Sequence, residues 1–451
     1  MTSALAQPPL PPEVSAALAR AKVPQDALSV LVVDADGKSA PRLSLRPQAQ
    51  VNPASVMKLV TTFAALETLG PAFVWTTPVY LEGAVREGTL YGNLYIKGQG
   101  DPKLVMERLW LLLRRVQGLG IRHITGDVVL DRSAFETVAQ DPGDFDGERL
   151  RPYNASPDAL LLNYKSLVMT FTPDALAKAA RVSYDPPLAG VLLPASVPLG
   201  EGICNDYRAT LKADFSDPNR IAFAGRYPTS CGERVWPVAY ADPASFPVRA
   251  VAGMWHEIGG LLDGAVREGK VPATLQPVFE MNSPTLVEVI RDINKYSNNV
   301  MAQQLFLTLS LQQKGVGTVT GSHEVVQAWW RERFGADDAP TLDNGSGLSR
   351  NGRISAHALA RLLQYAWRSP LMSELMSSLP VTGVDGTLKR SKAQASAHLK
   401  TGSLRDVTGV AGYVHAASGK RYVLVAIANH PNANAVRPAI DALIEWVARD
   451  N

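Results

Sequence analysis

The alternation of apolar and polar positions predicts the same kind of structure at both ends of the chain. Near the start, it predicts a helix over Pro12–Ala21, a buried strand over Leu28–Val33 and a second strand over Pro41–Leu45. Near the end, it predicts three strands and a closing helix, at His398–Ser403, Gly409–Val414, Arg421–Ala428 and Ala439–Arg449. Antiparallel strands at both ends with helices between them predict one α+β domain interrupted by an insert.

The insert has a different, strand-rich pattern. Short alternating strands are predicted from Thr76 to Lys97, and strands resume from Leu160 to Phe171 after a loop rich in Pro, Gly and Asp. Between them, a helix over Pro102–Val116 and a strand over Ile124–Leu130 form a small α/β unit. We therefore expect two nested inserted domains: a mostly β domain of residues 75–97 and 166–278, and a small α/β domain of 98–165, within an interrupted domain of 7–74 and 279–451.

The chain becomes helix-rich after the insert. We expect Ser283 to cap a helix that begins at Pro284, because proline is tolerated in a first helical turn and apolar residues follow at helical spacing. A polar break and two further helices are expected, at Tyr296–Asn299, Val300–Leu311 and Ala356–Trp367.

Composition narrows the class of protein. With 451 residues, 46% apolar and 19% charged, the chain is typical of a globular protein of two or three domains, which excludes a disordered chain. A net charge of +3, from 45 basic and 42 acidic residues, is too balanced to indicate nucleic-acid binding. The apolar run Leu109–Leu113 is far too short to cross a bilayer, so we expect no transmembrane segment.

Two features bear on the compartment. Ala4-Leu5-Ala6 before Gln7 is typical of the end of a signal-peptidase site, and an arbitrary alanine-rich start accounts for it equally well. Cys204 and Cys231 are the only cysteines. They form either one disulfide, which contributes about 3 kcal/mol by the loop-entropy account in an exporting compartment, or two buried free thiols.

The stretch Asn52–Lys58 carries the first candidate chemistry. Asn52 can cap a helix that begins at Pro53, which places Ser55 in the first turn, where unpaired N–H groups and the helix dipole favour an oxyanion. Lys58 lies three residues on, on the same helix face as Ser55. If desolvation or a neighbouring cation lowers its pKa, the amine accepts a proton and the serine becomes a nucleophile. Alone, this pair is equally typical of a solvated helix start.

Two later stretches supply the remaining parts of an acyl-transfer site. Ser297-Asn298-Asn299 lies in the polar break between two helices, where a hydroxyl can face a cleft and shuttle protons. Lys400-Thr401-Gly402-Ser403 begins a strand with a cation, a hydroxyl and a glycine that lets a ligand backbone approach closely.

In order, these three motifs resemble those of the penicillin-recognising serine enzymes. The roughly 240 residues between the first two resemble the class C low-molecular-mass penicillin-binding proteins, the D-alanyl-D-alanine carboxypeptidase/endopeptidases of peptidase family S13, which carry two extra domains there. Asp343–Arg350 resembles that family's Asp-Gly-Ser-Gly-Leu-Ser stretch with Asn344 added, and Val384–Thr387 resembles its Tyr-Asp-Gly-Ser segment. The resemblance covers nearly the whole chain.

The resemblance implies a role for each motif residue. Ser55 attacks the carbonyl of the penultimate D-alanine of a peptidoglycan stem peptide, and Lys58 takes its proton. Ser297 relays a proton to the leaving amine beside Lys400. The remaining substrate-binding residues implied are Asn299 for the substrate amide, Lys400 and Thr401 for the terminal carboxylate, Gly402 at the strand edge, and the backbone N–H groups of Ser55 and Ser403 for the oxyanion.

The family also implies a further subsite, partners and a compartment. Arg350 and an acidic residue of the innermost insert, Glu148 or Asp146, are the counterparts of residues that bind a free amino end of a peptidoglycan side chain in some members, although solvated loop charge is the simpler interpretation of the acidic pair. We expect acylation by β-lactams, no cofactor, no metal, no nucleic acid, and a periplasmic enzyme for which peripheral membrane association is open.

Three alternatives stay beside this hypothesis. A β-lactamase shares the motifs but lacks the long insert, and a non-catalytic peptidoglycan-binding protein would not need intact Ser55, Lys58 and Lys400. A metal hydrolase would need paired ligands. The seven histidines show no such spacing: His123, His256, His323, His357, His398, His415 and His430.

Overall fold

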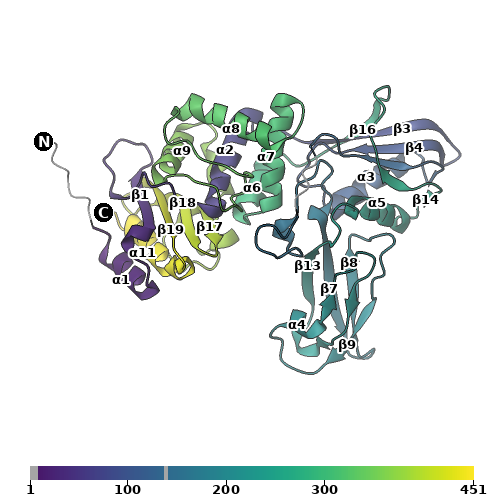
Figure 1. The fold of residues 1–451 in the computed structure, drawn as a ribbon, viewed down its shortest axis with the longest axis horizontal. Helices are drawn as coiled ribbons and strands as arrows, with labels where there is room; N and C mark the ends of the chain where they lie inside the picture. The colour runs from purple at the N-terminus through teal and green to yellow at the C-terminus, as the bar shows by residue number, and fades with distance from the viewer. Residues whose placement is uncertain (1–8, 137–140, 451) are drawn as a thin grey trace. The chain divides into compact units, whose positions relative to one another are not determined.

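The computed structural model describes residues 9–136 and 141–450, which divide into two compact units (Figure 1). Unit 1 joins the two ends of the chain, up to Val74 and from Pro284, and unit 2 is the segment Trp75–Ser283. The expected interruption of one α+β domain by an insert is confirmed, whereas Ala4-Leu5-Ala6 lies outside the described residues.

Unit 1 is built on a five-stranded antiparallel sheet in the order β17-β18-β19-β1-β2. Strand β1 from the start of the chain pairs with β19 from its end, with Leu28 opposite Ala428. All five strands expected from the alternation are confirmed: β1 (Leu28–Asp34), β2 (Leu43–Leu45), β17 (Ala397–Leu404), β18 (Val407–His415) and β19 (Arg421–Asn429).

Helices cover both faces of this sheet (Figure 1). Alternate residues such as Val30 and Leu424 pack with α1 (Pro12–Ala21) and α11 (Arg437–Ala448) in one apolar core. On the opposite face, the Tyr413 hydroxyl donates to the Leu363 carbonyl of α9 at 2.8 Å. The remaining helices of unit 1, of which α8 and α10 were not predicted, are α2 (Lys58–Leu69), α6 (Leu286–Lys295), α7 (Asn299–Lys314), α8 (Val319–Phe334), α9 (Ala356–Arg368) and α10 (Met372–Ser378).

The predicted start of α6 is wrong by two residues. Thr285, not Ser283, is the N-cap, and it forms a capping box in which the Glu288 carboxylate accepts from the Thr285 backbone N–H at 2.8 Å. Ser283 instead accepts a hydrogen bond from the Trp75 backbone at 3.0 Å. The capping box satisfies two helix-start donors at once, which a lone serine cap does not.

Unit 2 contains two larger sheets and a two-stranded one. The seven-stranded sheet joins β3 (Thr76–Arg86), β4 (Thr89–Lys97), β5 (His123–Ile124), β6 (Val128–Asp131), β14 (Leu261–Leu262), β15 (Val266–Glu268) and β16 (Pro277–Asn282). The five-stranded sheet joins β7 (Ser166–Asp174), β8 (Ala179–Asp185), β9 (Ser196–Gly200), β12 (Tyr227–Pro228) and β13 (Arg234–Ala239), and the small one joins β10 (Ala213–Asp214) and β11 (Ala222–Phe223). Its helices are α3 (Met106–Gly118), α4 (Tyr207–Leu211) and α5 (Phe246–Glu257).

Strand pairing crosses the inner boundaries that the sequence predicts. Strand β4, from the predicted 75–97 and 166–278 domain, pairs with β5 and β6 of the predicted 98–165 domain. The predicted strand over 160–171 begins only at Ser166. The three-way division stays a prediction.

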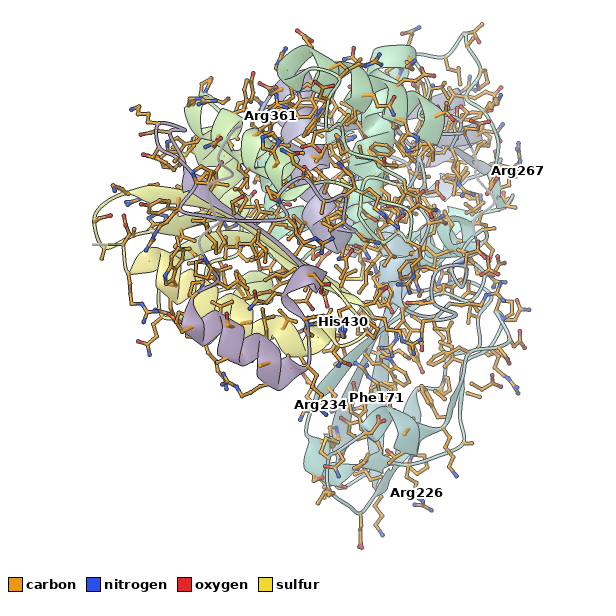
Figure 2. The ribbon with its side chains drawn as sticks, turned by 60° about the vertical axis from the view of Figure 1, so that its left-hand side comes forward. Phe171, Arg226, Arg234, Arg267, Arg361 and His430 are labelled. Atoms are coloured by element: carbon orange, nitrogen blue, oxygen red, sulfur yellow. A yellow bond between two sulfur atoms is a disulfide. The ribbon has the colours of Figure 1, made fainter. Side chains whose placement is uncertain are left out.

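A disulfide and an aromatic cluster lie in the part of unit 2 around the five-stranded sheet. Cys204 and Cys231 are bonded, which settles the alternative between a disulfide and free thiols. Phe171 stacks on Tyr227 with ring centroids 5.4 Å apart, in the same part of the unit as Arg226 and Arg234 (Figure 2).

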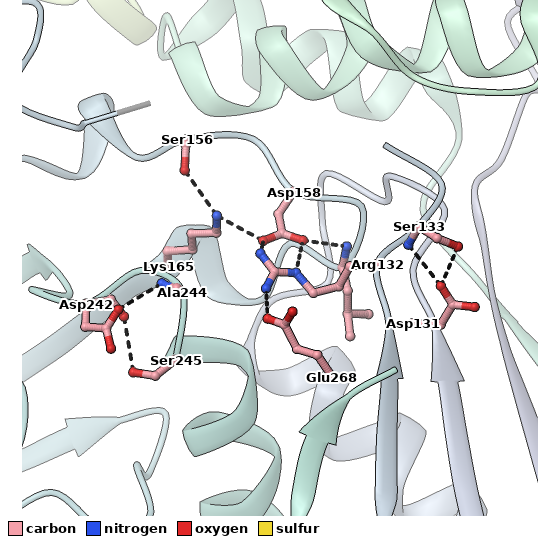
Figure 3. A network of polar contacts seen from close by, with 11 residues as sticks. Asp131, Arg132, Ser133, Ser156, Asp158, Lys165, Asp242, Ala244, Ser245 and Glu268 are labelled. Carbon is pink, nitrogen blue, oxygen red and sulfur yellow. Dashed lines mark hydrogen bonds and ion pairs between the residues drawn. The ribbon is translucent and has the colours of Figure 1, made fainter. Parts of the chain in front are cut away.

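A buried ion network in unit 2 joins Arg132, which directly follows β6, to Lys165, which directly precedes β7 (Figure 3). The Asp158 carboxylate, 2% exposed, accepts from Lys165 Nζ at 2.9 Å and from Arg132 Nε at 2.8 Å, and Arg132 also pairs with Glu268. Burial would raise the pKa of Asp158, but Lys165 and Arg132 hold it below its usual range.

Within the described ranges, no helix is both long and apolar enough to span a membrane.

Candidate active site

The Ser55 stretch is folded differently from the prediction. A 3₁₀ turn, Ala54–Met57, precedes α2, which begins at Lys58 instead of Pro53. The predicted cap is wrong by one residue: Pro53 is the N-cap and has no side-chain cap, while the Asn52 side-chain oxygen accepts from the Ala54 N–H at 2.8 Å. Ala54 has a left-handed backbone (φ +48°), which prevents a regular helix from starting earlier. Ser55 therefore lies in a tight turn ahead of the helix.

Two glycines allow other segments to approach this turn. A Cβ at Gly402, on β17, would lie 2.4 Å from the Pro53 carbonyl oxygen. A Cβ at Gly347, where φ is +75°, would lie 1.9 Å from the Ala54 carbonyl oxygen. The turn is thus held between strand β17 and the loop that contains Gly347, at distances that exclude any side chain.

Lys58 is a buried amine directed at the serine. Its Nζ lies 2.9 Å from Ser55 Oγ, 2.7 Å from Asn299 Oδ1 and 2.6 Å from the Ser346 carbonyl oxygen. The side chain is fully buried, and none of these partners is a carboxylate. Burial first, and then the charge of Lys400, hold the pKa of Lys58 well below its usual range. A neutral amine in this position can accept the serine proton.

The second and third motifs meet at a second buried lysine. Lys400 Nζ donates to Ser297 Oγ at 3.0 Å and to the Thr401 carbonyl at 2.7 Å. Burial lowers the pKa of Lys400 to about 7. Ser297 has a left-handed backbone (φ +57°) in the polar break, which ends where Asn298 caps α7 through Met301 N at 3.0 Å.

Strand β17, which contains Lys400, forms an edge of the unit 1 sheet. Thr401 is half-buried, and its hydroxyl lies 2.7 Å from the hydroxyl of Thr387, which is exposed. Ser403 is exposed, and its hydroxyl contacts Asn434 at 3.5 Å. Hydrogen bonds of unit 1 therefore form two groups, one of Ser55, Lys58 and Asn299 and one of Ser297, Lys400 and Thr401. The two groups come together where β17 passes the Ser55 turn at Gly402.

The residues of the predicted amino-end subsite are not brought together by these contacts. Arg350 is half-exposed and pairs with Asp406 at 3.1 Å. Glu148 belongs to unit 2, where it pairs with Arg151 at 3.3 Å. Asp146 accepts from Tyr153 at 2.9 Å and from Asn154 at 2.7 Å, so it holds its own loop. The pairing of Arg350 with Glu148 or Asp146 stays a prediction.

Sequence reasoning missed the third partner of Lys58. The Ser346 carbonyl comes from the Asp343–Arg350 stretch, which carries a family resemblance in the sequence but no predicted contact with Lys58. Its signal is the pair of glycines at positions 345 and 347, both at positive φ. At Gly345, a Cβ would lie 2.6 Å from the Phe306 ring, so the loop packs where only glycine fits.

The D-Ala-D-Ala carboxypeptidase 3 (S13) family matches residues 10–450 of this chain. The chain belongs to that family. This confirms the resemblance that the three motifs carry, and the α+β fold with it. Across the described residues, no three His, Cys, Asp or Glu side chains are grouped as metal ligands.

Relatives of this S13 chain span most of its length. A D-alanyl-D-alanine carboxypeptidase of Actinomadura sp. is 29% identical over 82% of this chain and 72% of its own, and one of Haemophilus influenzae is 25% identical over 83% and 80%. The solved penicillin binding protein 4 of Haemophilus influenzae has the same fold, with a TM-score of 0.77, 22% identity, and coverage of 96% of this chain and 99% of that one. A predatory endopeptidase of Bdellovibrio bacteriovorus, acylated by penicillin G, shares it with a TM-score of 0.54 and 16% identity over 94% and 92%.

Proposed function

We propose that this S13 chain is a serine D,D-peptidase that acts on peptidoglycan stem peptides through an acyl-enzyme on Ser55. The observation that carries the proposal is the fully buried Lys58 amine, 2.9 Å from Ser55 Oγ and without a carboxylate partner among the described residues. Membership of a family named for D-Ala-D-Ala carboxypeptidases, and relatives of the same name, support the substrate class.

The acylation step uses the two lysines in different ways. Lys58, neutral because it is desolvated and close to Lys400, removes the Ser55 proton as the oxygen attacks the carbonyl of the penultimate D-alanine. Ser297 delivers a proton to the leaving D-alanine nitrogen and takes one from the Lys400 ammonium, which donates to its oxygen, so the proton lost by Lys400 balances the one gained by Lys58. The C–N bond breaks, an ester forms on Ser55, and water later hydrolyses this ester.

Substrate binding divides between β17 and Asn299. Backbone N–H groups of Ser55 and Ser403 bind the developing oxyanion, and loss of one such donor typically costs about a hundredfold or more in rate. Thr401 binds the terminal carboxylate through its hydroxyl. Lys400 is fully buried and bonded to Ser297, so it contributes its charge to the carboxylate through space. Asn299 positions the substrate amide while its side-chain oxygen accepts from Lys58.

Two further proposals concern the reaction with β-lactams and the compartment. A β-lactam presents a strained amide and a carboxylate in the place of D-Ala-D-Ala, so we expect it to acylate Ser55. The Cys204–Cys231 disulfide is typical of an oxidising compartment, which supports a periplasmic location. Hydrolysis of purified muropeptides, with the products separated by mass, shows whether the enzyme prefers carboxypeptidase or endopeptidase action.

Labelling with a fluorescent penicillin tests the proposal. The wild type is expected to form a stable adduct that disappears in Ser55→Ala, and to release D-alanine from a pentapeptide in the presence of chelator. An unlabelled but folded wild type supports the non-catalytic wall-binding alternative. Rapid loss of the adduct supports a β-lactamase-like hydrolase, and loss of D-alanine release with chelator supports a metal hydrolase.

A further inference from the structure

The segment that resembles the family's Tyr-Asp-Gly-Ser stretch touches the third motif. Thr387 Oγ1 lies 2.7 Å from Thr401 Oγ1, and Thr387 is exposed. One of the two hydroxyls donates its proton to the other, so the second hydroxyl is able to donate its own proton to a ligand. Two adjacent hydroxyls also match the two oxygens of one carboxylate.

This segment also closes one end of the β17 edge. Leu399 N donates to the Pro380 carbonyl at 2.9 Å, and Thr382 N donates to the Ala397 carbonyl at 3.1 Å. Outward backbone groups recur every second residue of an edge strand, so the next ones belong to Thr401 and Ser403. The segment thus occupies the β17 edge as far as Leu399. A peptide that pairs with the free part of this edge would therefore meet Thr387, and its chain would have to end there.

An ion pair fixes the segment. The Asp385 carboxylate accepts from Lys295 Nζ at 2.6 Å and from Val381 N at 2.9 Å. Gly386 has φ +54°, and a Cβ there would lie 2.4 Å from the Lys295 carbonyl oxygen. Lys295 ends α6, directly before the break that carries Ser297. The pair therefore couples the Thr387 turn to the second motif.

We propose that Thr387 is a second hydroxyl, beside Thr401, that binds the terminal carboxylate of the substrate, and that the Lys295–Asp385 pair positions it. This rests on the proposed D,D-peptidase function and deepens it. Hydrogen bonds from the two hydroxyls, together with the charge of Lys400, make the carboxylate itself a requirement of the substrate. Thr387 thus contributes to specificity for a chain end.

Steady-state kinetics with two pentapeptides tests this role. One peptide ends in D-Ala-D-Ala with a free carboxylate, and the other carries a terminal carboxamide. Because a hydrogen bond to a charged group is stronger than one to a neutral group, Thr387→Val is expected to raise KM for the carboxylate peptide roughly tenfold, with kcat changed less than about threefold. Its kcat/KM for the carboxamide is expected to change less than about twofold.

Three further variants keep the result specific. Thr387→Ser retains the hydroxyl and is expected to behave as the wild type. Thr320→Val removes an exposed threonine hydroxyl of α8 and is the matched control. Asp385→Asn is expected to raise KM for the carboxylate peptide in the same direction, with little further effect when Thr387 is already valine, because both changes act on one interaction.

The outcomes separate this inference from the proposed function. Equal loss on both peptides, or no loss on either, in a folded Thr387→Val protein that still labels with penicillin would overturn the carboxylate role alone. A wild type that neither releases D-alanine nor forms a penicillin adduct would overturn the proposed function instead.

Discussion

Lys165 of unit 2 and the two lysines of the candidate site in unit 1 are all buried, but their surroundings are opposite. In unit 2, Lys165 is almost fully buried beside the Asp158 carboxylate, 2.9 Å away, with Arg132 on the other side. In unit 1, Lys58 and Lys400 are fully buried, and all their hydrogen bonds among the described residues go to neutral oxygens. The charge of Lys165 is thus paired with a carboxylate. The neutral surroundings of Lys58 and Lys400 instead disfavour the charged form of each amine.

The comparison explains why burial alone does not indicate function. Burial of a charged amine is costly unless an opposite charge compensates, and an uncompensated amine instead loses its proton more readily. The pKa of Lys58 and that of Lys400 are lowered by burial, whereas the Asp158 carboxylate is held ionised by its cations. A buried lysine without a carboxylate is therefore a candidate base, and one with a carboxylate joins parts of the structure.

The largest effect is expected from Lys58→Met. Methionine fills a similar volume but cannot accept a proton, so acylation by penicillin and D-alanine release should fall by about a hundred- to ten-thousandfold. Stopped-flow acylation measures the loss, and a urea unfolding curve verifies that the protein is folded. Acylation within threefold of the wild type would contradict the role of Lys58 as base.

The reverse result is expected from Lys165→Met. This change leaves Asp158 buried with one cation fewer, and removal of one partner of a buried pair typically lowers the free energy of unfolding by about 3–5 kcal/mol. Urea unfolding of the full chain measures it, with exposed Lys270→Met as the control. The penicillin acylation rate of the folded protein should stay unchanged; a rate that falls as in Lys58→Met would erase the contrast.

The pH dependence of the free energy of unfolding tests whether burial lowers the pKa of Lys400. With a pKa of about 7 when folded against 10.5 ordinarily, Lys400 binds fewer protons in the folded state, so its contribution makes the free energy of unfolding rise with pH between these values. The slope is at most about 1.4 kcal/mol per pH unit. Lys400→Met should remove this pH-dependent contribution to the free energy of unfolding.

The same titration should affect substrate binding. Above pH 7, KM for a carboxylate peptide should rise as Lys400 loses its charge, and a pH-independent KM would contradict the role of this charge.

The smallest effect is expected at the exposed pair of Arg350 and Asp406. Both side chains are about half exposed, and such pairs typically contribute 0–1 kcal/mol. Asp406→Asn should therefore change the free energy of unfolding by less than about 1 kcal/mol, as measured by urea unfolding. A loss as large as that of Lys165→Met would show that exposure is a poor guide in this protein.

The motifs and the sheet of unit 1 were predictable because they are local. Alternation gives each strand, and the Ser55, Ser297 and Lys400 motifs are short segments with distinctive residues. The start of α2 was not predictable from Asn52-Pro53, because Ala54 has a left-handed backbone and the segments packed against this turn, at Gly347 and Gly402, come from elsewhere in the chain. Thr285 and Glu288, by contrast, carried a capping-box signal that the prediction overlooked.

Long-range contacts account for the rest. The Ser346 carbonyl on Lys58 and the Thr387 hydroxyl on Thr401 depend on loops whose residues have no periodic pattern. The pairing of β4 with β5 and β6 depends on the register of very short strands, which alternation does not specify. The sequence therefore located the residues proposed to react, but not the groups that hold them in place.

Direct titration of Lys58 tests the central claim, that this amine is neutral when the enzyme works. Carbon NMR of the protein with ¹³C-labelled lysine side chains resolves individual Cε resonances, and Lys58→Met assigns the one that disappears. The account predicts that this resonance titrates well below the ordinary lysine value of 10.5 and moves when Lys400 is replaced by methionine. A Lys58 resonance that titrates near 10.5 in the folded protein would contradict it.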